Sequence, residues 1–99
     1  MFLAPAPLID FAASDEGLSL GDVLLTWSYP AVGVWSQIVL TCVPDHCSST
    51  PRVNKITTVS RGYQNLTPGQ IYAFQAAIQS NGVETLQTIE YPLRKFTLL

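Results

Sequence analysis

The residues best suited to covalent chemistry are two cysteines that flank a short turn. Cys42 and Cys47 enclose residues 43–46, which include a Pro-Asp pair. Side chains that face each other across a hairpin have Cβ atoms roughly 4.5 Å apart, close to the roughly 3.8 Å that a disulfide requires. Closing so short a loop contributes about 2 kcal/mol in the chain-entropy model. The spacing therefore predicts a Cys42–Cys47 disulfide and an oxidising compartment, with two free thiols in a cytosolic protein as the alternative.

Zinc binding is the other chemistry that this segment offers. His46 and the two cysteines would supply three ligands, whereas a structural zinc ion takes four. The chain has no other histidine and no second cysteine cluster. Serine-nucleophile patterns and glycine-rich phosphate loops do not occur, and acids such as Asp15 and Glu84 have no partner motif. We therefore predict no metal site, no cofactor and no enzymatic activity.

A third reactive position is Asn65, which begins the N-glycosylation sequon Asn-Leu-Thr. A glycan would attach there in a secreted protein. Asparagine also tolerates a left-handed backbone, so Asn65 is equally suited to a tight turn. The two interpretations are compatible, and both place this residue on the surface.

The composition indicates one folded domain. The 99 residues are 47% hydrophobic and 12% charged, with a net charge of −2. That is enough apolar material for a core and too little charge for a disordered chain. Five scattered cations give no nucleic-acid footprint, and no apolar run is long enough to insert into a membrane. We expect residues 1–6 to be a linker or an artificial start of the chain, and residues 7–99 to be the domain.

Short alternating runs, interrupted by Pro, Gly, Asn and Asp, predict strands and no helix. The expected strands span residues 8–13, 18–28, 35–43, 55–60, 62–66 and 70–79, followed by a last strand over 86–91 and 95–99 that Pro92 interrupts. Such a series fits a seven-stranded, two-sheet Greek-key sandwich. Its expected core contains Ile9, Phe11, Val23, Leu25, Trp27, Leu66, Tyr72, Phe74, Ala76 and Ile89.

Residues 66–72 read Leu-Thr-Pro-Gly-Gln-Ile-Tyr, which resembles the corner motif of fibronectin type III domains. The resemblance implies that Tyr72 starts the sixth strand, buries its ring and turns its hydroxyl back to an upstream backbone group. Pro68 and Gly69 would make the crossing between the sheets, and Leu66 would fill the core beneath them. These residues are the expected structural core of the corner.

The second expected strand supports the same resemblance. Trp27 is followed three residues later by Pro30, as in the second strand of that family, and Pro7 stands just before the first strand. An immunoglobulin domain is the rival sandwich, because it carries its tryptophan on the third strand and Trp35 begins that strand here. The immunoglobulin disulfide, however, joins the second and sixth strands, where this chain has no cysteine.

The third strand has two possible registers. One places Ile38, Leu40 and Cys42 in the core, and a slip of one residue would exchange them for the opposite face. We expect Ile38 and Leu40 to point inward because they are the larger side chains.

The resemblance implies a non-catalytic extracellular module for protein–protein interaction, adhesion and spacing within a larger multidomain receptor or matrix protein. Its partners would be a protein or neighbouring domains of the same chain, and the domain itself would be monomeric. Trp35 is the candidate partner contact, although an aromatic at a sheet end often packs over the core rim. The alternatives are an accessory module of a secreted enzyme and an intracellular structural spacer.

The secretory assignment predicts two features of the mass of the domain when eukaryotic cells secrete it. Unreduced, denatured protein should bind no thiol-alkylating reagent, whereas reduced protein should bind two equivalents, one for each cysteine. Glycosidase should lower the mass of the secreted protein, and the Asn65→Gln variant should show no such change. Intact-mass spectrometry measures both mass changes. Two alkylated thiols in the unreduced protein would contradict the predicted disulfide.

Overall fold

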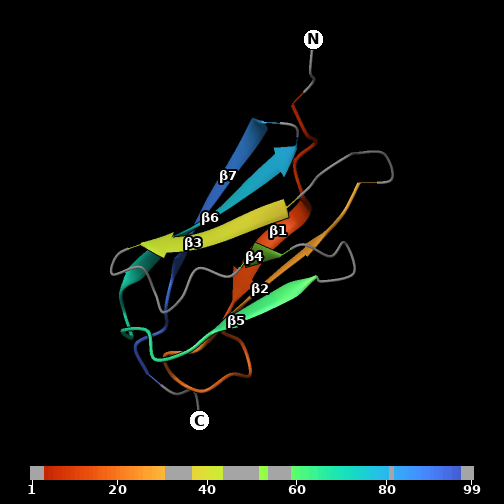
Figure 1. Ribbon diagram of the computed structural model, residues 1–99. Helices are drawn as coiled ribbons and strands as arrows, with labels where there is room; N and C mark the ends of the chain where they lie inside the picture. Colours follow the sequence, from red (N-terminus) through yellow and green to blue (C-terminus); the bar gives the residue numbers. More distant parts are fainter. Residues whose placement is uncertain (1–3, 31–36, 44–51, 54–58, 81, 97–99) are drawn as a thin grey trace.

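The computed structural model describes residues 4–30, 37–43, 52–53, 59–80 and 82–96, which form two packed β-sheets (Figure 1). One sheet has the strand order β1-β2-β5 and the other β4-β3-β6-β7, with every pairing antiparallel. The strands are β1 (Ile9–Ser14), β2 (Val23–Ser28), β3 (Gln37–Val43), β4 (Arg52–Val53), β5 (Ser60–Tyr63), β6 (Ile71–Ser80) and β7 (Val83–Pro92). No helix occurs in this part of the chain, and the predicted all-β sandwich fold is confirmed.

Alternation of side chains builds the core between the sheets. In β2, Val23, Leu25 and Trp27 are buried while the intervening residues are exposed. In β3, the buried residues are Ile38, Leu40 and Cys42, so the register predicted for this strand is confirmed. The period of two thus sorts one face of each strand to the interior, as expected for a sandwich.

The start of β1 departs from the prediction that Ile9 lies in the core. Ile9 is 45% exposed, and Leu8 and Phe11 are buried instead. The pairing with β2 shifts between Ile9 and Ala12, and Asp10 has a positive φ of 53°. A β-bulge of this kind places one extra residue in a strand and reverses the alternation, which is why the period-two reading was wrong for Ile9.

Strand limits also differ from the predicted ones. Most of the expected strand 55–60 lies outside the described residues, and β5 begins at Ser60, before the expected residue 62. β7 begins earlier than predicted and runs without interruption to Pro92. Pro92 is tolerated because it ends an edge strand, where a missing N–H costs little. Beyond it, the Leu93 N–H still donates to the Gln70 carbonyl oxygen at 3.0 Å.

The corner before β6 has the predicted geometry. Tyr72 is buried, and its hydroxyl oxygen accepts the N–H of Thr67 at 2.9 Å. Leu66 is buried beneath the corner, and its N–H donates to the Gly21 carbonyl oxygen at 2.8 Å. Gly69 has a φ of 82°, and a Cβ there would lie 2.9 Å from Cγ of Lys95. A side chain at this position is therefore strained as well as crowded.

Aromatic rings fill the space between the sheets. Trp27 meets Phe11 edge-on, with ring centroids 6.5 Å apart. Phe74 of β6 packs against Tyr72 at 6.3 Å and against Tyr63 of β5 at 5.5 Å. The Tyr63–Phe74 pair therefore joins the two sheets across the core.

Two tyrosine substitutions separate the corner hydrogen bond from the packing of the rings. Tyr72→Phe should lower the free energy of unfolding by about 1–2 kcal/mol, because the Thr67 N–H loses its acceptor. Tyr63→Phe is the matched control: within the described residues the buried Tyr63 hydroxyl has no hydrogen-bond partner, so its removal should be neutral or stabilising. Urea denaturation measures both, and equal losses in the two variants would contradict the role of the corner bond.

Candidate functional site

Only some of the residues predicted to be reactive or exposed belong to the part of the chain that the structure describes. Cys42 is buried near the end of β3, while Cys47, His46 and Trp35 lie outside the described residues. The Cys42–Cys47 disulfide and the partner role of Trp35 therefore stay predictions. Asn65 is exposed and has a φ of 63°, which confirms the left-handed turn predicted for it.

Within the part of the chain that the structure describes, potential metal ligands do not cluster. No group of three or more His, Cys, Asp and Glu side chains gathers there in a way that would hold a metal ion. Nor does that part of the chain contain a helix long and apolar enough to cross a membrane.

Polar side chains on the inner face of β7 fasten the N-terminal segment. The Gln87 side chain accepts the Leu8 N–H through Oε1 at 2.7 Å and donates through Nε2 to the Leu8 carbonyl oxygen at 3.0 Å. The Thr85 hydroxyl donates to the Pro5 carbonyl oxygen at 2.5 Å. A side chain thus replaces the backbone hydrogen bonds that would join β7 to the start of β1. These contacts close one side of the sandwich.

At the other end of the sandwich, Asp15 also connects the N-terminal part of the chain to β7. It is buried, and its carboxylate accepts the Tyr91 hydroxyl at 2.6 Å and the Arg94 N–H at 3.0 Å. The Arg94 guanidinium donates to the carbonyl oxygens of Asp15 and Leu18. The loop between β1 and β2 is thereby tied to the end of β7.

The ionisation of this cluster follows from its contacts. Burial alone would raise the pKa of Asp15, but the Arg94 N–H and the Tyr91 hydroxyl outweigh it, and the net pKa is lowered. The pKa of Tyr91 is raised, first because its hydroxyl donates to Asp15 and then because it is partly desolvated. This cluster was not predicted: Asp15 was interpreted as a scattered acid and Arg94 as a solvated cation. The alternation along β7, which turns Tyr91 inward, is the one signal that could have indicated it.

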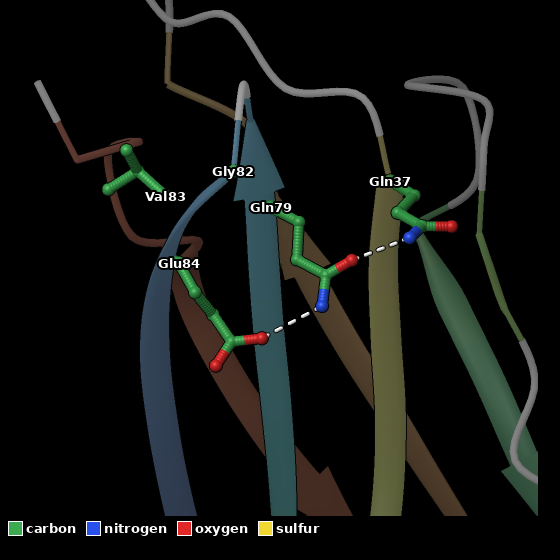
Figure 2. A pocket seen from close by; sticks show the side chains of 5 residues that line it. All are labelled: Gln37, Gln79, Gly82, Val83 and Glu84. Carbon is green, nitrogen blue, oxygen red and sulfur yellow. Dashed lines mark hydrogen bonds between the residues drawn. The ribbon is translucent and has the colours of Figure 1, made fainter. Parts of the chain in front are cut away.

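A pocket of about 360 Å³ lies beside the β6–β7 hairpin, where Gln37, Gln79, Gly82, Val83 and Glu84 line it (Figure 2). Its three polar side chains form a chain of hydrogen bonds. Gln37 Nε2 donates to Gln79 Oε1 at 2.5 Å, and Gln79 Nε2 donates to Glu84 Oε2 at 2.8 Å. Amides and a carboxylate supply recognition rather than a nucleophile, so this pocket is suited to binding. Of these residues, Glu84 was considered from the sequence only as an acid without a partner motif, and its contact with Gln79 was not predicted.

Known proteins resemble the chain in structure and not in sequence. It matches no protein-family model and no curated protein. Among solved structures, a computer-redesigned β-sandwich protein is 14% identical with a TM-score of 0.71, covering 98% of this chain and 100% of its own. The structure of FN3tt mut is 19% identical with a TM-score of 0.67. The match covers 91% of this chain and 97% of the FN3tt chain. The chicken CNTN1 FN1–FN3 domains are 15% identical with a TM-score of 0.68 over 93% of this chain, which spans 33% of that structure.

The chain has the fibronectin type III fold. These likenesses agree with the corner that Tyr72 makes and with the strand orders of the two sheets. The resemblance stated from residues 66–72 is therefore supported by the structure as a whole. The fibronectin type III fold also occurs in chains of several domains, such as the chicken CNTN1 FN1–FN3 structure.

The cluster of Asp15, Tyr91 and Arg94 makes the stability of this domain depend on pH. Because the folded state lowers the pKa of Asp15 below its ordinary 3.8, the unfolded state binds more protons in acid. The stabilisation is present above about that pH and is lost as the pH falls through the folded-state pKa. Asp15→Asn should cost about 1–3 kcal/mol at neutral pH, and its difference from the wild type should shrink towards pH 2.

Denaturation curves from pH 2 to pH 7 measure this dependence. Glu16→Gln is the matched control, because Glu16 is the adjacent acid and is exposed. Its curve should follow that of the wild type. A deficit of Asp15→Asn that stays constant down to the lowest pH would contradict the assignment of the charged form.

Proposed function

We propose that the domain is an extracellular, non-catalytic module that binds proteins and spaces its neighbours within a larger receptor, adhesion or matrix protein. The shape of the molecule is the observation that carries this proposal. Its extents are 52 × 25 × 18 Å, and the described part of the chain begins and finishes at opposite ends of the molecule (Figure 1). A domain of this form adds length between its neighbours and leaves both sheet faces available to partners.

The extracellular location rests on chemistry in the sequence. An exposed sequon at Asn65 and a closely spaced cysteine pair are both features that the secretory pathway modifies. The occurrence of three such domains in the chicken CNTN1 structure supports the use of the fold in serial arrays.

A spacer beside a catalytic domain is the second candidate. The twitchin kinase region from C. elegans, described as Fn31-NL-kin-CRD-Ig26, resembles this chain with a TM-score of 0.61 and 13% identity. The chain covers 17% of that structure. Its arrangement supports a role for the fold next to an enzyme, inside or outside the cell.

Binding of extracellular proteins distinguishes these candidates. The domain, multimerised to raise its avidity, is tested against a panel of cell-surface and secreted ectodomains by surface plasmon resonance, with FN3tt as a control that shares the fold. We expect saturable binding to at least one ectodomain that the control does not bind. The absence of any ectodomain partner, together with free thiols and an unmodified Asn65, would overturn the proposal in favour of the intracellular spacer.

A further inference from the structure

The outer face of the four-stranded sheet begins, at the β6–β7 hairpin, with a row of polar side chains. Gln37, Gln79 and Glu84 are cross-strand neighbours in this row, which we call the polar row. Two hydrogen bonds link the row in one direction, from Gln37 to Gln79 and from Gln79 to Glu84 (Figure 2). The row therefore ends in a carboxylate, and Glu84 Oε1 accepts no hydrogen bond from the described residues.

The negative charge of Glu84 is not balanced by a described cation. Among the described residues no ion pair to Glu84 is seen: Arg94 is engaged by the β1–β2 loop, Lys95 lies against Gly69 at the other end of β6, and Arg61 belongs to the other sheet. Arg52 lies on β4, which is separated from β7 by β3 and β6, so the two backbones are about 14 Å apart. Glu84 is therefore available to a cation supplied by a partner.

The adjacent row of the same face is apolar. Val39, Ala77 and Leu86 are cross-strand neighbours in this apolar row, one step along the strands from the polar row. Leu86 is 55% exposed, whereas Ala77 between its larger neighbours is buried. The row thus forms a shallow surface against which an aliphatic side chain can pack.

Acidic, apolar and polar side chains also follow one another along the outward positions of β7. Glu84, Leu86, Thr88 and Glu90 are all exposed and occupy alternate positions of the strand. Alternate residues of a strand are about 6.6 Å apart, and so are alternate side chains of any extended peptide. A peptide lying along β7 would therefore present a basic, an apolar, a polar and a basic side chain in turn to these four residues.

We propose that this face docks an extended segment of another protein in which basic, apolar, polar and basic residues occupy alternate positions. The proposal rests on the binding function proposed above and gives it a surface and a partner chemistry. The basic groups pair with Glu84 and Glu90, and the apolar side chain covers the apolar row. A second copy of this face would add two further carboxylates, Glu84 and Glu90, and the one described arginine in register with the face, Arg52, lies on the opposite edge strand β4.

A titration with a designed peptide tests the proposal. The probe is a blocked peptide in which arginine, leucine, threonine and arginine alternate with serine, and the comparison peptide has glutamate in place of each arginine. Heteronuclear NMR of the labelled domain should show shifts confined to the side-chain amides of Gln37 and Gln79 and to β7. The glutamate peptide should cause none. Shifts elsewhere, or equal binding of the two peptides, would overturn the proposal.

Matched variants locate the contact. Glu84→Gln should weaken binding of the arginine peptide about threefold, as for an exposed ion pair, and Leu86→Ser about tenfold. Glu16→Gln and Leu24→Ser remove the same groups away from this face and should leave the affinity unchanged. The NMR spectra of the variants report at the same time whether each is folded.

The same variants separate this proposal from the wider one. If an ectodomain binds the wild type and the two β7 variants equally well, the proposed docking face is wrong, whereas the proposal of an interaction module still holds. If no ectodomain of the panel binds and the arginine peptide does not bind either, both the docking face and the interaction module are ruled out.

Discussion

The hydrogen bond from the Thr67 N–H to the Tyr72 hydroxyl fixes the point at which the chain crosses between the sheets. A buried phenol is stabilised when its hydroxyl has a hydrogen-bond partner, and this corner supplies one while it buries the ring. The bond sets the starting position of β6, the strand that pairs with both β3 and β7. Every row on the outer face, including the one that ends in Glu84, inherits its alignment from β6.

A second constraint is the closure of the sandwich where β1 meets β7. These strands belong to different sheets, and side chains rather than a backbone ladder join them. Gln87 satisfies the backbone of Leu8 at one end, and the Asp15 cluster ties the β1–β2 loop to β7 at the other. The bulge at Asp10 lies between these two points, and β1 pairs with β2 on both sides of it.

Local patterns in the sequence were sufficient for the sandwich, for the corner and for the inward register of β3. They were sufficient because alternation and turn chemistry act over a few residues. The exposure of Ile9 escaped prediction, since a bulge leaves no periodic signal. The Asp15–Tyr91–Arg94 cluster and the Gln37–Gln79–Glu84 pocket escaped as well, because their members are far apart in sequence and meet only when the strands are paired. The cysteine pair and Trp35 lie partly or wholly beyond the described residues.

The way in which Gln87 holds the N-terminal segment has a mechanical consequence. A tension applied between the ends of the chain acts along the long axis of the molecule. The contacts that hold this segment are the hydroxyl hydrogen bond at Pro5, the two side-chain hydrogen bonds at Leu8 and the burial of the Leu8 side chain. Release of the segment therefore requires these hydrogen bonds to break, Leu8 to enter water and the Ile9–Ser28 pairing to open together, so a pull on this end loads side-chain contacts of β7 as well as the β1–β2 ladder.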